Sequence, residues 1–140
     1  MHEPEIITFD PWPDPAIDPY GQDPNGDWSR LAWLPIIGPS SWLVCGTLAA
    51  QLRHDPHVTW GVQDLAAAHG LHGTTSRTGP MRRTVARLCQ FRLVADTDGV
   101  DRFVVRLTAP PLFRRQLSRL PVYVAELQRQ IFQVPRHQAG

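Results

Sequence analysis

Three arginines in one short stretch have the types and spacing needed to bind an anion. Arg82 and Arg83 are adjacent in GPMRRTVARLCQFRLV, the sequence of residues 79–94, and Arg87 follows one helical turn later. A guanidinium group makes forked hydrogen bonds to phosphate oxygens and to the edges of guanine. The stretch therefore forms either a helix that lies against a polyanion or one whose basic side faces only water.

A helical wheel divides this stretch into two sides. The apolar side consists of Met81, Val85, Leu88 and Cys89. The opposite side carries Arg83, Arg87 and Gln90, and Arg82 lies on the flank. Short polar residues precede the stretch, namely Thr74, Thr75, Ser76, Arg77 and Thr78. Hydroxyl and amide groups near a helix N-terminus suit phosphate contacts.

The charge of the chain is unevenly distributed. Residues 1–28 contain seven acidic residues and no arginine, whereas the remainder holds all 14 basic residues, every one an arginine, against six acidic ones. Such a split is typical of a charged tail or of a nucleic-acid partner. Six of the 14 prolines also lie in residues 1–28. We expect a disordered acidic, proline-rich tail there, with Trp12, Tyr20 and Trp28 able to dock on a surface.

Ordered structure is expected to begin near Trp33. A helix follows Gly38 or Ser40, with Pro39 in its first turn, and ends before Pro56. Its apolar stripe consists of Val44, Leu48 and Leu52, with Cys45 beside them. HVTW is a short β-prone run, and GVQDLAAAHGL predicts a second helix that stops at Gly70.

The hairpin signal is the clearest in the chain. FRLVA and RFVVRL are rich in β-forming residues, and DTDGVD between them supplies turn residues. Two short helices then follow, PLFRRQLSRL and PVYVAELQRQIF, separated by Pro121. We therefore expect a mainly α chain with a small β-hairpin and C-terminal helices.

This order of elements resembles the winged helix-turn-helix superfamily over about residues 39–107. VTWGVQDLAAAHGL looks like the strand and first helix of the motif, and MRRTVARLCQFRLVADTDGVDRFVVRL looks like its recognition helix and wing. The pattern R.L..F.LV, common where that helix enters the wing, is supplied by Arg87, Leu88, Phe91, Leu93 and Val94. The segment from Leu71 to Gly79 is longer than the usual turn of three or four residues.

The resemblance implies a three-helix core plus wing in a sequence-specific protein that binds double-stranded DNA, a bacterial transcriptional regulator. Its domain would cover residues 29–108, between the tail of residues 1–28 and a C-terminal helical extension of residues 109–140. The recognition helix would be about residues 79–90 and the wing about residues 92–107. The expected DNA-binding residues are Thr74, Thr75, Ser76, Arg77, Thr78, Arg82, Arg83, Arg87, Gln90 and Arg102.

Other functional classes were weighed against this one. The chain has no P-loop, G-x-S-x-G or H-E-x-x-H motif, so we expect no enzyme and no cofactor. His54 with His57, and His69 with His72, have two residues between them rather than the helical spacing of a zinc site, so no metal is expected. The alternative that stays open is a winged-helix protein-interaction or adapter module without DNA binding.

The remaining expectations concern assembly and location. Val124, Leu127 and Ile131 form an apolar stripe that either packs on its own domain or pairs with a second copy as a homodimer. No apolar run approaches the ~20 residues that span a bilayer. Cys45 and Cys89 lie in apolar contexts, typical of buried free thiols in a reducing cytoplasm. We expect a cytoplasmic protein without a membrane partner.

Overall fold

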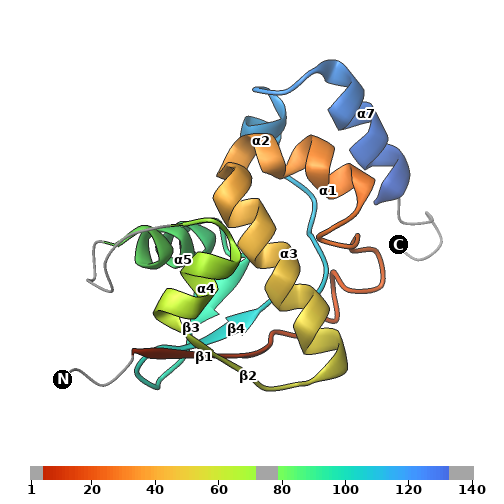
Figure 1. Cartoon of the computed structure of the whole chain (residues 1–140). Coiled ribbons are helices and arrows are strands. Elements are labelled where there is room, and N and C mark those ends of the chain that lie inside the picture. The colour runs from red at the N-terminus through yellow and green to blue at the C-terminus, as the bar shows by residue number, and fades with distance from the viewer. Residues whose placement is uncertain (1–4, 72–78, 133–140) are drawn as a thin grey trace.

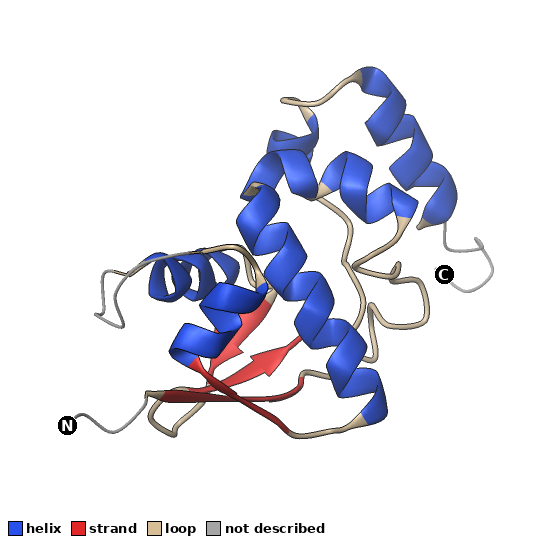
Figure 2. Cartoon of the chain, viewed as in Figure 1, coloured by secondary structure: helices blue, strands red, loops and turns tan. Residues whose placement is uncertain are grey.

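The computed structural model describes residues 5–71 and 79–132 of the 140-residue chain. Within these ranges the chain is mixed α/β, with seven helices and one four-stranded sheet (Figure 1, Figure 2). The strands are β1 (Ile6–Pro11), β2 (Val58–Gly61), β3 (Val94–Asp96) and β4 (Arg102–Val105). The helices are α1 (Asp27–Ala32), α2 (Leu34–Ile37), α3 (Pro39–His54), α4 (Val62–Ala68), α5 (Pro80–Gln90), α6 (Arg114–Leu117) and α7 (Val122–Ile131). No helix in the described ranges has the length and apolar character needed to cross a bilayer.

The N-terminal strand lies inside the sheet, whose strand order is β2-β1-β4-β3. β1 pairs antiparallel with β2 and parallel with β4, so that Phe9 has Val58 as its partner on one side and Phe103 on the other. Side chains of β1 alternate between the two faces, and Ile7 and Phe9 are fully buried. The predicted β3–β4 hairpin is confirmed, and it forms one edge of a larger sheet than the sequence indicated.

The structure corrects the prediction of a disordered tail over residues 1–28 for the part that it describes, residues 5–28. Residues 5–28 are part of the fold, and four of the six carboxylates of this segment form ion pairs with the rest of the chain. The ion pairs are Glu5–Arg82 at 3.1 Å, Asp10–His57 at 2.8 Å, Asp14–Arg106 at 2.7 Å and Asp23–Arg53 at 3.3 Å. The opposite charges of the two segments therefore attract within one folded unit instead of marking a separate tail.

Two aromatic residues of the segment also dock on the body of the protein. Trp28 is buried in α1 and meets Phe132 edge to face, with 5.0 Å between ring centroids. Trp12 lies under the guanidinium of Arg106, at 4.1 Å from its ring centroid. These two rings supply apolar contact area for folding. The average composition of residues 1–28 did not reveal it.

Helix α3 forms the centre of the molecule and was correctly predicted. Gly38 precedes it with φ at 87°, a backbone conformation that favours glycine, and Pro39 occupies its first turn. The expected stripe is buried, with Val44, Leu48 and Leu52 facing the core. α3 contacts strands β1, β2 and β4 as well as α2 and α5, and Figure 1 shows it between the sheet and the α1–α2–α7 group.

The elements on either side of α3 also follow the sequence. β2 runs directly into α4, which ends before Gly70, a left-handed glycine with φ at 70°. α4 packs against α5, and α5 leads into the β3–β4 hairpin. Both C-terminal helices are confirmed as well. α7 packs on α1, and Gln128 bonds both backbone groups of Leu112, at 2.8 and 3.0 Å.

The apolar stripe on α7 packs on its own chain. Val124 is buried, and Leu127 and Ile131 are partly buried against the same core. Within the described residues this stripe therefore has an intramolecular role, the first of the two that the sequence left open. A homodimer through this helix stays a prediction.

Candidate nucleic-acid interface

Helix α5 has one buried and one exposed side, as its helical wheel predicted. Its buried residues are Met81, Thr84, Val85 and Leu88, while Arg83, Ala86, Arg87 and Gln90 are exposed. The exposed residues are spaced by three or four positions, so they form one surface along the helix. Burial against α3 and α4 fixes which side of α5 faces outward. Arg83, Arg87 and Gln90 thus share a single outward face.

Arg82 is held by two carboxylates. Its two Nη groups donate to Asp101 at 2.6 and 3.1 Å, and Nη2 also donates to Glu5 at 3.1 Å. The hydrogen bonds to Asp101, followed by those to Glu5, raise the pKa of the Arg82 guanidinium, and only 17% of its side chain is exposed. Arg82 therefore ties α5 to the start of β4 and to the segment leading into β1, rather than extending into solvent.

Arg87 has a second structural attachment. Its Nε donates to the carbonyl of Ile37 at 2.7 Å, and Nη2 donates to the carbonyl of Ile36 at 3.1 Å. Carbonyls in the last turn of a helix lack intrahelical donors, so Arg87 satisfies two groups at the end of α2. The guanidinium also lies 5.4 Å from the ring centroid of Phe91. Arg87 is exposed, but its orientation is fixed by these contacts.

Arg83 and Gln90 have the fewest side-chain contacts among the residues of the outward face of α5. Both are exposed, and no side-chain hydrogen bond or ion pair joins either to another residue in ranges 5–71 and 79–132. Arg102 is also exposed, at the start of β4. Its neighbour Asp101 is bonded to Arg82, so the hairpin and α5 are connected at this point. Side chains alternate along β4, so Arg102 lies on the face of the sheet opposite the buried Phe103 and does not share the outward face of α5.

Thr74, Thr75, Ser76, Arg77 and Thr78 lie outside the described residues. Their expected role in contacting phosphates stays a prediction. The hairpin turn, in contrast, is described, and it exposes the carboxylates of Asp96 and Asp98. Negative charge at the tip of the hairpin repels phosphate groups, so the cationic part of this surface lies on α5 rather than on the turn.

A hollow of about 360 Å³ opens where the first turns of α3 and α5 meet. It is lined by Ile37, Gly38, Pro39, Ser40, Ser41, Leu71, Pro80, Arg83, Thr84 and Arg87. Both outward arginines of α5 line it, and no carboxylate does among the described residues. The first backbone N–H groups of the 16-residue helix α3 have no intrahelical acceptor, and the helix dipole adds positive potential there. The hollow therefore suits an anionic group.

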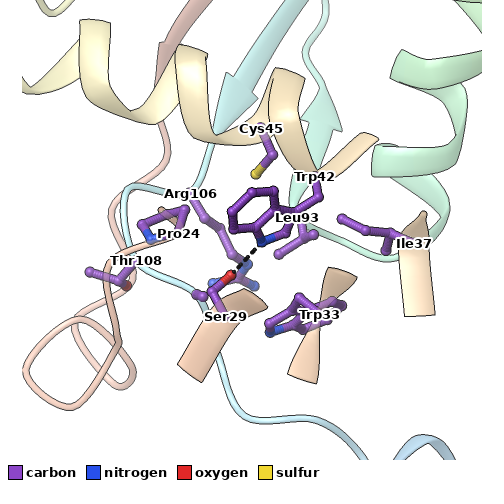
Figure 3. Close-up of a pocket in the computed structure, with 10 residues that line it drawn as sticks. Pro24, Ser29, Trp33, Ile37, Trp42, Cys45, Leu93, Arg106 and Thr108 are labelled. Carbon is purple, nitrogen blue, oxygen red and sulfur yellow. Dashed lines mark hydrogen bonds between the residues drawn. The ribbon is translucent and has the colours of Figure 1, made fainter. Parts of the chain in front are cut away.

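A second, enclosed pocket lies between α1, α2 and α3 (Figure 3). Trp33, Trp42 and Cys45 line it, and Trp42 Nε1 donates to Ser29 Oγ at 3.0 Å. Its volume of about 10 Å³ holds at most one water molecule, so it is a packing void. Burial raises the pKa of the Cys45 thiol to about 12, and burial is also the main cause that raises the pKa of Cys89. Both thiols are therefore protonated at neutral pH, whereas a nucleophilic cysteine acts as the thiolate.

Two of the histidines weighed as zinc ligands, His57 and His69, have other partners, and His54 is exposed at the end of α3. His57 Nδ1 is 2.8 Å from Asp10 Oδ1, and His69 lies 2.7 Å from Thr47 Oγ1 and 2.8 Å from the Leu65 carbonyl. His72 lies outside the described ranges. Among the described residues, no group of three or more His, Cys, Asp or Glu side chains could hold a metal ion.

Sequence reasoning missed the groups that hold the arginines. Asp101 directly precedes Arg102 in the hairpin turn, and Glu5 precedes the β-prone run IITF, but neither spacing indicates a contact with Arg82. The Ile36 and Ile37 carbonyls are backbone groups, so their use by Arg87 leaves no trace in residue types. Neither a family model, nor a curated protein, nor a solved structure matches this chain.

Proposed function

We propose that the chain is a winged helix-turn-helix protein that binds double-stranded DNA in a sequence-specific manner, as a cytoplasmic bacterial transcriptional regulator. The observation that carries the proposal is the outward face of α5, which bears Arg83, Arg87 and Gln90 and whose two arginines line the hollow at the start of α3. An exposed α-helix fits the major groove of B-DNA, and arginine and glutamine there bind base edges in pairs of hydrogen bonds.

The proposed contacts differ among the arginines. Arg83 and Gln90, two turns apart on α5, would reach base edges. The amides at the start of α3 and the guanidinium of Arg87 would bind a backbone phosphate in the hollow, and Arg102 would bind a phosphate beside the hairpin. Arg82, expected from the sequence as a contact residue, would instead hold the hairpin against α5 through Asp101.

The adapter function has one observation in its favour. Phe113, Val122 and Tyr123 expose 78%, 74% and 60% of their surface around α6 and α7, as residues at a protein interface often do. This surface would serve a module that binds a protein partner and no DNA.

DNA binding is tested by selecting duplexes from a random pool and measuring affinity by fluorescence anisotropy over a salt series. Tight binding should weaken steeply with salt, by a log–log slope of about 0.9 for each phosphate contacted. Arg83→Gln should weaken binding to the selected duplex by about tenfold or more, the effect of losing a paired base contact. Arg129→Gln, an exposed arginine on α7, is the matched control and should bind as the parent does.

Two results would count against DNA binding through α5. Equal affinities of Arg83→Gln and Arg129→Gln for the selected duplex would show that Arg83 on α5 does not contact the bases. Absence of binding at low salt, where electrostatic attraction is strongest, would favour the adapter function instead.

A further inference from the structure

A cleft of about 600 Å³ lies at the opposite end of α5 from the hollow. Its walls come from the end of α5, from α6 and from the segment between β4 and α6. The lining residues are Ile17, Trp33, Gln90, Phe91, Arg92, Arg106, Pro110, Pro111, Phe113, Arg115, Gln116 and Arg119. This volume is within the range of roughly 300–1,000 Å³ that small-molecule sites occupy.

The floor of the cleft combines aromatic and proline side chains with the ion-paired Arg106, and hydrogen bonds hold it in place. Trp33 Nε1 donates to the Pro110 carbonyl at 2.8 Å, which fixes the indole against the proline segment. Arg106 donates to the Arg92 carbonyl and to Asp14, each at 2.7 Å, and only 14% of its side chain is exposed. These contacts form the floor before any ligand arrives, and a preformed site loses less entropy on binding.

The rim of the cleft carries positive charge that no carboxylate of its lining balances. Of the four arginines that line the cleft, only Arg106, in its floor, forms an ion pair within the described ranges, with Asp14. Arg92, Arg115 and Arg119 are exposed, and the latter two are four residues apart in the turns of and after α6. Their guanidinium groups can therefore reach the same ligand group from one side of the cleft.

The backbone of Arg92 gives a further indication that the rim is built for a ligand. Arg92 follows α5 with φ at 61°, the left-handed conformation in which helices usually place glycine. A side chain in this conformation costs stability, and such positions gather at binding sites. The guanidinium lies 5.1 Å from the ring centroid of Trp12, so the aromatic ring supports the cation at the edge of the cleft.

We propose that this cleft binds a small organic anion with a flat aromatic body. Arg115 and Arg119 would bind its carboxylate, sulfonate or phosphate group, and Phe91 and Phe113 would cover its ring. The chemistry differs from that of a DNA backbone, because the aromatic and proline side chains of the floor offer nothing to a phosphodiester chain. The site shares only Gln90 with the outward residues of α5, so it does not depend on the proposed DNA binding.

The test uses 8-anilino-1-naphthalenesulfonate, an aromatic sulfonate whose fluorescence rises in an apolar site, and its neutral analogue N-phenyl-1-naphthylamine. The sulfonate should bind the full chain, and the double variant Arg115→Gln/Arg119→Gln should weaken it by about tenfold or more, because charge-assisted hydrogen bonds are lost. Arg114→Gln is the matched control, since this exposed neighbour on α6 does not line the cleft. Binding of the neutral analogue should be the same in all three proteins.

Competition by 1-naphthoate and by adenosine monophosphate then identifies whether a carboxylate or a nucleotide is the better source of the anion. Displacement by either supports the proposal. Three results would overturn it: no sulfonate binding, equal loss in Arg114→Gln and the double variant, or displacement by a short DNA duplex while both small anions fail to compete. Circular dichroism of each variant checks folding, and these exposed side chains should leave the unfolding midpoint unchanged.

Discussion

Substitution of Phe9 by alanine should strongly destabilise the protein, because Phe9 is a residue of its buried core. Phe9 is fully buried in β1, and its ring stacks on Phe103 with 5.9 Å between centroids. Removing a buried phenylalanine side chain costs about 3–5 kcal/mol, of which roughly 0.5–1.5 kcal/mol comes from the aromatic pair. In a chain of this size we expect the thermal unfolding midpoint to fall by about 10–15 °C.

Urea and thermal unfolding followed by circular dichroism measure this loss. The matched control is Ile6→Ala in the same strand, because 51% of Ile6 is exposed and its truncation should change stability by less than about 1 kcal/mol. If the N-terminal segment were disordered, neither substitution would change the unfolding midpoint. Equal midpoints for Phe9→Ala and Ile6→Ala would therefore refute the placement of β1 inside the sheet.

Two further predictions concern the contacts of residues 5–28. The hydrogen bond from Arg106 is the main cause that lowers the pKa of Asp14 below its ordinary value of 3.8, so this carboxylate stabilises the fold above about pH 4. The difference in urea midpoint between the parent and Asp14→Asn should be full at pH 7 and disappear as the pH falls through the lowered pKa; a difference that persists below that pH would exclude this cause. Gly46→Ala should gain little from the higher helix propensity of alanine, because its Cβ would displace Asn25 Oδ1 and break the hydrogen bond from Asn25 Nδ2 to the Gly46 carbonyl, at a cost of about 0.5–1.5 kcal/mol. Chemical denaturation of Asn25→Gly with and without Gly46→Ala checks the cause, since the alanine should stabilise the protein once the Asn25 side chain is absent.

The elements that sequence reasoning predicted well are those whose signals are local. Pro39 after Gly38 marks the start of α3, and Gly70 marks the end of α4, because each residue has a backbone preference that does not depend on distant contacts. The two faces of α5 follow from its periodicity in the same way. Those predictions needed only neighbours within one or two turns.

The errors arose where partners are distant in the sequence. IITF at residues 6–9 is a β-prone run, but its averaged surroundings of proline and aspartate indicated disorder. Its pairing with β2 and β4 and the ion pairs of the segment depend on tertiary contacts. For the candidate site, the outward direction of Arg83 was predictable, whereas the attachment of Arg82 to Asp101 was not. The cleft beside α6 combines residues from five separate segments, which no motif describes.

The position of β1 has a consequence for the order in which the protein folds. During synthesis the residues of β1 leave the ribosome long before their partners in β4, residues 102–105. The centre of the sheet therefore cannot form until those later residues have been made, and closing so long a loop costs entropy before the strand pairs repay it. Until then Ile7 and Phe9 remain without their final cover. The protein should accordingly fold late in translation and more slowly than a helical domain of its length.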